Sequence, residues 1–210
     1  VENDTFLHKV GLGESFGYQA SGTVPGIVEG SNEPQLRLSE YQNTLRVVTT
    51  DYLTEDQQPL HRLFTVQQQA DQLVTVGQLP NAAYPEPLGK PGEDVYAVRY
   101  VGHRAYVVTF ERIDPLYVID TSDPAQPQML GALEIPGVSN YLQPISSQYL
   151  LGIGQQIEAD QIPANGQVVI QPLPVQQMKI SLFDVSDPQQ PLELSTLVKD
   201  HSYTPAEYDY

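Results

Sequence analysis

The chain has 210 residues, and its 26 acidic side chains outnumber the 10 Lys and Arg residues to give a formal net charge of −16. Nucleic acids and anionic membranes repel so acidic a surface, so both are disfavoured as partners. There is no cysteine, which excludes disulfides, thiolate catalysis and cysteine-bound zinc or iron–sulfur clusters, and no apolar run approaches the roughly 20 residues of a transmembrane helix.

Strands are expected along most of the chain, and no stretch shows a helical period. In chain order, residues 45–50, 95–101, 105–110 and 149–154 are rich in β-branched, aromatic or small apolar side chains. The second and third of these runs flank a turn that contains Gly102, and this pattern predicts a β-hairpin. The sequence therefore predicts an all-β chain.

An internal repeat organises these strands. Residues 116–127 and 180–191 lie 64 positions apart, and each is an apolar strand followed by the motif Asp-x-Ser-Asp-Pro. Weaker copies lie upstream, where Pro25, Pro80 and Pro136 end comparable strands at spacings of 55 and 56 residues. A period of about 55 residues is typical of β-propeller blades, which are four-stranded antiparallel sheets. We therefore predict a single β-propeller domain or fragment over the whole chain, with about four repeat units, as part of a larger propeller.

Two segments interrupt this period. Residues 157–177 are rich in proline and contain the turn signal Asn165-Gly166, so we predict an inserted loop there, with a short hairpin. Residues 81–94 contain three further prolines and predict a second inserted loop. Insertions of this kind leave the sheets intact, and functional residues often lie on them.

The Asp-x-Ser-Asp-Pro motif has two interpretations. Carboxylate and hydroxyl oxygens are ligands that Ca²⁺ prefers, but the motif lacks the glycine and the closing glutamate of an EF-hand loop. We favour a structural turn, in which the aspartates accept backbone N–H groups and the proline fixes the next turn position. The residues of this turn motif are Asp120, Ser122, Asp123, Pro124, Asp184, Ser186, Asp187 and Pro188.

Other chemical motifs are weak. Residues 13–17 match the G-x-S-x-G pattern of hydrolase nucleophiles, but the pattern joins two expected strands and no helix follows, so we interpret it as a hairpin turn. The four histidines lack the spacing of metal-binding motifs, and we expect each to be structural or at the surface. They are His8, His61, His103 and His201.

Local pairs of carboxylates could do acid–base work or bind a divalent cation. Most lie in expected loops, where solvated charge is the ordinary interpretation. The pairs are Glu55 with Asp56, Glu93 with Asp94, Glu158 with Asp160, and Glu207 with Asp209.

The chain resembles a known family along nearly its whole length. Residues 98–110, 114–124, 135–137 and 183–188 are similar to those of secreted bacterial proteins with a C-terminal β-propeller that is distantly related to WD-type repeats. Residues 117–124 also resemble the LVIVD-type propeller repeat. The resemblance implies a propeller, export, and a cell-envelope setting, either periplasmic or extracellular. It implies no activity and no catalytic residues.

We therefore expect a non-catalytic binding or scaffolding propeller of an exported bacterial protein, without a cofactor and with a protein or glycan partner. Self-association is also expected if a sheet face stays uncovered. Two alternatives stay open. One is a hydrolase or lyase with a metal-assisted site in the propeller channel, and the other is calcium-dependent adhesion.

Overall fold

The computed structural model describes residues 3–12, 16–28, 34–54, 58–110, 114–156 and 177–207. Within these ranges the chain is built from β-strands, and its helical turns are two short 3₁₀ helices, η1 (Pro34–Arg37) and η3 (Pro205–Glu207). The prediction of an all-β chain made of four-stranded antiparallel sheets is confirmed. Among the described residues, no helix is long and apolar enough to cross a membrane.

The first sheet has the spatial order β1-β2-β6-β5-β4-β3. Its strands are β1 (Asp4–Gly11), β2 (Gly17–Pro25), β3 (Leu38–Tyr41), β4 (Thr44–Asp51), β5 (Leu60–Gln69) and β6 (Gln72–Leu79). Strands β3 to β6 pair antiparallel with their chain neighbours, and so do β1 and β2. In contrast, β2 joins β6 through one parallel bridge between Ser21 and Gln72. The sheet is therefore a four-stranded sheet, β3–β6, to which the β1–β2 pair is attached.

Two more four-stranded sheets follow, with the orders β10-β9-β8-β7 and β11-β12-β13-β14. Their strands are β7 (Asp94–Val101), β8 (Arg104–Phe110), β9 (Asp114–Asp120), β10 (Gln128–Ile135), β11 (Val138–Pro144), β12 (Tyr149–Gln155), β13 (Gln177–Asp184) and β14 (Leu192–Asp200). The β7–β8 pair confirms the hairpin predicted around Gly102. Most of the predicted insertion at 157–177 lies outside the described residues, which resume at Gln177 as the first residue of β13.

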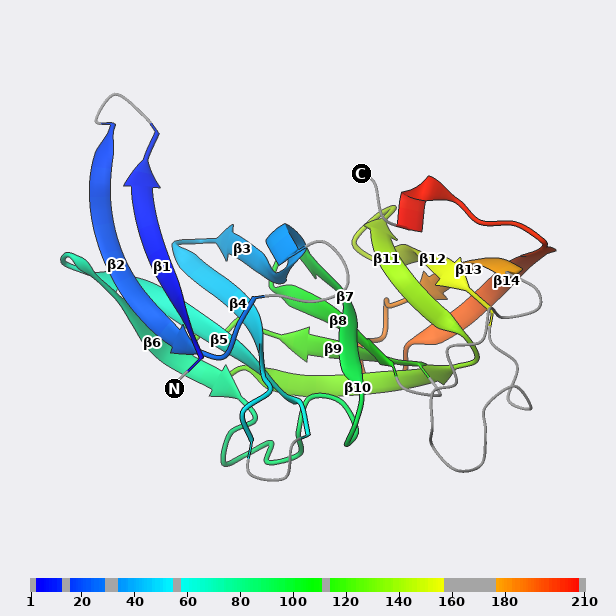
Figure 1. Cartoon of the computed structure of the whole chain (residues 1–210), viewed down its shortest axis with the longest axis horizontal. Coiled ribbons are helices and arrows are strands. Elements are labelled where there is room, and N and C mark those ends of the chain that lie inside the picture. The colour runs from blue at the N-terminus through cyan, green and yellow to red at the C-terminus, as the bar shows by residue number, and fades with distance from the viewer. Residues whose placement is uncertain are drawn as a thin grey trace.

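The sheets follow one another along the long axis of the molecule, from the β1–β2 pair at one end to β11–β14 at the other (Figure 1). Side chains fill each space between neighbouring sheets, because alternate residues of a strand point to opposite faces. The core between β1–β2 and β3–β6 includes Leu7 and Phe64, the next includes Leu63 and Val107, and the third includes Leu116 with residues of β11–β14. The sheets β3–β6 and β7–β10 thus each present one face to the sheet before and the other to the sheet after.

Glycines allow these sheets to approach closely at their outer strands. A Cβ added at Gly77 in β6 would lie 2.2 Å from the carbonyl oxygen of Pro124, and one at Gly131 in β10 would lie 2.6 Å from that of Pro188. A Cβ on Gly22 in β2 would lie 2.1 Å from the carbonyl oxygen of Leu73. No side chain fits at these distances. Gly77 and Gly131 are therefore seats, positions where the backbone of the connection between the last two strands of the next sheet packs directly on a glycine, whereas Gly22 packs on strand β6.

The two ends of the sheets differ in their connections. Tight turns join β3 to β4 and β5 to β6, and Gln42, Asn43 and Ala70 in these turns have positive φ. The longer connections 52–59 and 80–93 lie at the opposite end, on the lower side of Figure 1. We call this the loop end, and the end with the tight turns the turn end.

Candidate functional site

Three hollows lie side by side on the loop end, and the connections 52–59 and 80–93 line them. The first has a volume of about 530 Å³ and is lined by Asn3, Asp4, Pro25, Asp51, Leu53, Arg62, Phe64 and Gln78. The second, about 460 Å³, is lined by Thr54, Gln58, Pro59, Leu60, Pro87, Leu88, Gly89, Lys90 and Pro91. The third, about 250 Å³, is lined by Leu79, Ala83, Tyr84, Pro85, Glu86, Leu88 and Met129. Leu53 and Thr54 connect the first hollow to the second, and Leu88 is shared by the second and the third.

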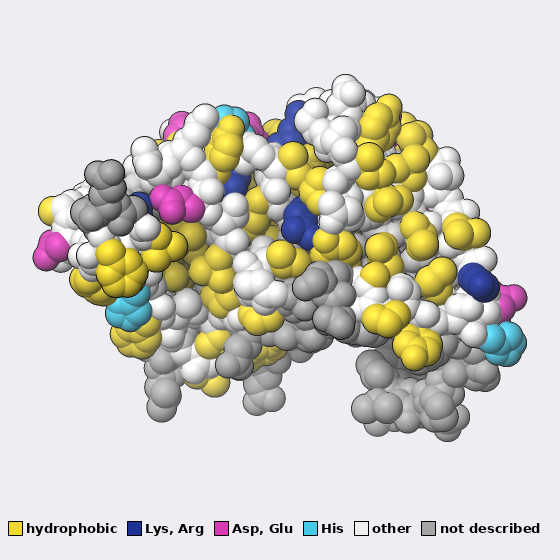
Figure 2. Space-filling model, turned by 90° about the horizontal axis from the view of Figure 1, so that it is seen from above, with side chains coloured by type: hydrophobic (Ala, Val, Ile, Leu, Met, Phe, Trp, Pro, Cys, Tyr) yellow, Lys and Arg dark blue, Asp and Glu magenta, His cyan; other side chains and the backbone are white. Residues whose placement is uncertain are grey.

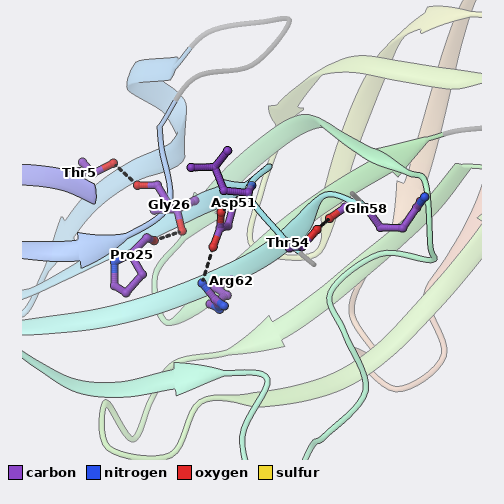
Figure 3. A network of polar contacts seen from close by, with 9 residues as sticks. Thr5, Pro25, Gly26, Asp51, Thr54, Gln58 and Arg62 are labelled. Carbon is purple, nitrogen blue, oxygen red and sulfur yellow. Dashed lines mark hydrogen bonds and ion pairs between the residues drawn. The ribbon is translucent and has the colours of Figure 1, made fainter. Parts of the chain in front are cut away.

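Polar contacts hold the walls of the first hollow (Figure 3). Arg62 of β5 forms an ion pair with Asp51 of β4 at 3.6 Å, and both side chains are about three-quarters buried. The Asp51 carboxylate also accepts the backbone N–H of Leu53 at 2.9 Å, which fixes the start of the loop that separates the first two hollows. Farther along this loop, the Thr54 hydroxyl donates to the carbonyl oxygen of Gln58 at 2.5 Å. These two hydrogen bonds fix the described residues at either end of this loop, Leu53 and Thr54 on one side and Gln58 on the other.

The second and third hollows are more apolar. Three proline rings, Pro59, Pro87 and Pro91, line the second, and Leu79, Tyr84 and Met129 line the third. The Tyr84 hydroxyl donates to the side chain of Gln128 at 3.2 Å, which holds the ring in place. Proline rings lose little conformational entropy when a ligand covers them. These two hollows therefore offer rigid apolar surface.

A buried polar chain lies directly beneath the second hollow. The Arg37 guanidinium donates to the Thr50 hydroxyl at 3.1 Å, and Thr50 lies 2.9 Å from Nδ1 of His61. Nε2 of His61 lies 2.6 Å from the carbonyl oxygen of Glu93. Because a carbonyl only accepts, Nε2 carries the hydrogen and Nδ1 accepts the proton of Thr50. In the neutral imidazole that burial favours, all donors of this chain thus point in one direction.

Burial is the main reason why the pKa of His61 lies below its ordinary value, and the nearby Arg37 charge lowers this pKa further. His61 is 1% exposed. It lies against Gly89, where an added Cβ would come within 3.2 Å of the imidazole ring. The imidazole thereby joins β5 to the connection that lines the hollow above it.

Glu93 ends the same connection and is buried, so the expectation of a solvated charge at this position is wrong. Its carboxylate accepts the backbone N–H of Lys90 at 2.8 Å and the hydroxyl of Thr109 at 2.5 Å. These bonds replace the water that the carboxylate loses on burial. Burial, with a smaller contribution from the Glu93 charge, raises the pKa of Tyr117 to about 12.

The residues of the Asp-x-Ser-Asp-Pro motif lie elsewhere, at the turn end, in the β9–β10 and β13–β14 connections. Asp120 accepts both the backbone N–H and the hydroxyl of Ser122, and Asp184 accepts the backbone N–H of Ser186. Asp123 accepts the backbone N–H two residues on, and Asp187 does the same in its own connection. The carbonyls of Pro124 and Pro188 are the groups that rest on Gly77 and Gly131.

The remaining candidate residues do not converge on one place. Gly13, Glu14 and Ser15 of the G-x-S-x-G pattern lie outside the described residues, as do the pairs at 55–56 and 158–160 and the residue Asp209. His8 contacts Tyr18 on the β1–β2 pair, whereas His103 lies edge-on to Tyr41 at the turn end. In the described ranges, no group of three or more His, Asp or Glu residues could hold a metal ion.

Two buried arginines were not singled out by the sequence. Arg37 donates to the backbone of Val95, and Arg46 donates to the carbonyl of Gly102 at 2.5 Å and packs on the Tyr100 ring at 4.6 Å. Both bridge β3–β6 to β7–β10. The one signal in the sequence was the placement of Arg46 inside an apolar strand, where a charge is normally excluded unless it is paired.

The chain has relatives in two archaea. It is 33% identical to the uncharacterized protein MJ1554 of Methanocaldococcus jannaschii over 187 residues. This match covers 88% of this chain and 26% of that protein. It is 34% identical to an uncharacterized protein of Archaeoglobus fulgidus over 156 residues. This match covers 74% of this chain and 20% of that protein. The chain thus spans about a quarter or less of the length of these relatives. The model of a family described as a beta propeller domain matches residues 1–210.

Proposed function

Because the chain belongs to the beta propeller domain family, we propose that it is a non-catalytic binding domain that holds an extended polypeptide segment across the three hollows of the loop end. Propellers commonly serve as binding or scaffold domains, but function belongs to a particular site rather than to a fold. The neighbourhood of the three hollows carries the proposal, and we treat them as one path: Leu53 and Thr54, which are adjacent in the chain, line the first and the second hollow, and Leu88 lines both the second and the third.

The chemistry of this path indicates the kind of segment. The first hollow is polar, with the Asp51–Arg62 pair at its wall, and the next two are lined by proline, leucine and aromatic side chains. A matching segment carries apolar side chains at two positions and a polar stretch on one side of them. Apolar anchors in preformed pockets supply most of the binding free energy in such complexes.

The walls of the path are rigid enough to bind without a large ordering cost. The buried His61 and Glu93 fix the connection 80–93 from below, while Asp51 fixes the start of the loop 52–59. Preorganised surfaces lose less entropy on binding, so their contacts contribute more to affinity.

The test selects a displayed library of random linear peptides on the chain and then measures the affinity of the selected synthetic peptides by calorimetry. We expect a Kd between about 1 µM and about 1 mM, as for a short segment on a shallow surface. Pro87→Arg places a charged side chain at the exposed rim of the second hollow and should weaken binding at least tenfold. Ile145→Arg is the matched control, because Ile145 is 56% exposed and lies in the β11–β12 turn, away from the hollows.

Two results would overturn the proposal. One is that no peptide is enriched on the wild-type chain over the Pro87→Arg variant. The other is that the selected peptides bind both variants with the affinity of the wild type. Circular dichroism of each variant verifies that its fold is retained.

We also propose that the protein acts outside the cytoplasm. The support is the resemblance of residues 98–110, 114–124 and 183–188 to secreted proteins that carry a β-propeller. The test is fractionation of cells that make the full natural protein, followed by immunodetection. Recovery in the envelope or medium supports export, and recovery in the cytosol alone contradicts it.

A further inference from the structure

A smaller hollow lies at the turn end, away from the path of the loop end. It has a volume of about 140 Å³, which is the space of about four or five water molecules. The β3–β4 turn, the β7–β8 turn and the β9–β10 connection meet around it, so two neighbouring sheets supply its walls. The lining side chains are polar or aromatic apart from one proline, and none of these described residues is acidic: Tyr41, Gln42, Thr44, Arg46, Gln67, His103, Thr121, Ser122 and Pro124.

Arg46 supplies a buried positive charge at the wall of this hollow. Its side chain is 3% exposed, and it donates to neutral oxygens only, those of Gly102, Ser39 and Thr121. Nε of Arg46 has no hydrogen-bond acceptor in the part of the chain that the structure describes. Within the same ranges no carboxylate forms an ion pair with this guanidinium. Among the described residues, the charge is therefore buried without a counter-ion.

Aromatic rings compensate this buried charge only in part. The guanidinium carbon of Arg46 lies 5.5 Å from the centre of the Tyr41 ring and 4.6 Å from that of Tyr100. Burial lowers the pKa of Arg46 below its ordinary value, but an arginine side chain stays charged near neutral pH. Since buried charges in proteins are normally paired, an anion in the hollow would supply the missing partner.

The surroundings of the hollow favour an anion in spite of the net charge of the chain. The His103 ring and the side-chain amides of Gln42 and Gln67 add N–H groups to its walls. The Asp120 carboxylate beside this wall is already engaged, because its two oxygens accept the backbone N–H and the hydroxyl of Ser122. Figure 2 views the molecule from above, on the side away from the loop end, and shows several Lys and Arg side chains near the middle and Asp and Glu mainly toward the edges.

We infer that this hollow is a binding site for a carboxylate group, which the charge of Arg46 holds. The site is separate from the path at the loop end and does not depend on the function proposed for that path. One guanidinium balances the single negative charge of a carboxylate, whereas the net charge of −16 opposes the second charge of a phosphate. The bonds from Arg46 to Gly102 and Ser39 hold the guanidinium in place, so binding costs little further ordering.

The experiment titrates the chain with sodium acetate at constant ionic strength, with sodium chloride as the reference salt. We expect the melting temperature to rise to saturation with a Kd between about 0.1 mM and about 10 mM, since so small a ligand has few atoms with which to bind. In NMR spectra the Nε–H signal of Arg46 and the amide signals of Gln42 and His103 should shift, whereas those of the connection 80–93 should not. Sodium phosphate should bind more weakly by about tenfold or more.

An isosteric variant tests whether the hollow itself binds the acetate. Gln67→Glu places a carboxylate in the wall, where the Thr44 hydroxyl can donate to it in place of the present bond from the Gln67 amide. This internal carboxylate should compete with acetate and weaken its binding by about tenfold or more. Gln68→Glu is the matched control, because it makes the same change one residue along β5 on the opposite face and should keep the wild-type affinity.

A second comparison identifies the source of the carboxylate. N-acetylated diglycine with a free C-terminal carboxylate is titrated beside its C-terminal amide and beside acetate. Tighter binding of the free peptide than of acetate assigns the site to the terminus of a polypeptide, and tighter binding of acetate assigns it to a small free acid. An amide that binds as well as the free peptide overturns the inference. So does acetate that acts no differently from chloride, or that binds Gln67→Glu as it binds the wild type.

Discussion

At the scale of single residues, burial decides the chemistry. His61 and Glu93 belong to residue types that are usually at the surface, yet they hold the connection 80–93 through hydrogen bonds to backbone groups. The sequence predicted either a structural or a surface position for the histidine, and a solvated charge for Glu93. The reason for this error is that one of its partners, Thr109, becomes a neighbour only after β7 and β8 have paired.

His61 makes stability depend on pH. Its folded pKa lies below the unfolded value, so the unfolded state takes up the proton first, and the contribution of His61 is lost as pH falls from about 6.5 toward the folded pKa. We expect the free energy of unfolding to drop by up to about 1.4 kcal/mol per pH unit in this window. Urea denaturation at several pH values measures the free energy of unfolding, and its slope against pH should be shallower for His61→Gln than for the wild type. Equal slopes in wild type and His61→Gln would contradict the prediction.

At the scale of elements, the repeat determines how sheets meet. The period of prolines and the two Asp-x-Ser-Asp-Pro copies predicted the strands well, because strand patterns and turn residues are local signals. The seats at Gly77 and Gly131 could not be predicted, since each depends on a carbonyl of the next sheet. The same limit applies to the hollows of the loop end, whose walls come from separate connections.

Replacing a seat glycine should separate two sheets. In Gly77→Ala the new methyl group would meet the backbone of Pro124, so the neighbouring sheet must shift, and we expect a loss of about 1–3 kcal/mol in the free energy of unfolding. Gly17→Ala is the control in β2, where nothing lies within 4 Å of an added Cβ, and its change should stay within about 1 kcal/mol. Denaturant unfolding measures the free energy of unfolding of both variants. Equal stability of the two variants would contradict the role of the seat.

At the scale of the whole molecule, charge opposes assembly. Each chain carries a formal charge of −16, so two copies repel each other at long range. The composition of the sequence alone predicted this repulsion. It could not indicate which faces of the sheets pack together, because that depends on how the sheets stack.

The contrast between the loop end and the turn end has a consequence for engineering the protein. Added residues within 81–87 lengthen a connection that already departs from the sheets, so the pairing of every strand is preserved. One residue added between Gln42 and Asn43 would instead change the register of β3 against β4 and turn its side chains to the wrong face. To preserve strand pairing, a reporter or affinity tag is therefore inserted within 81–87 and not between Gln42 and Asn43.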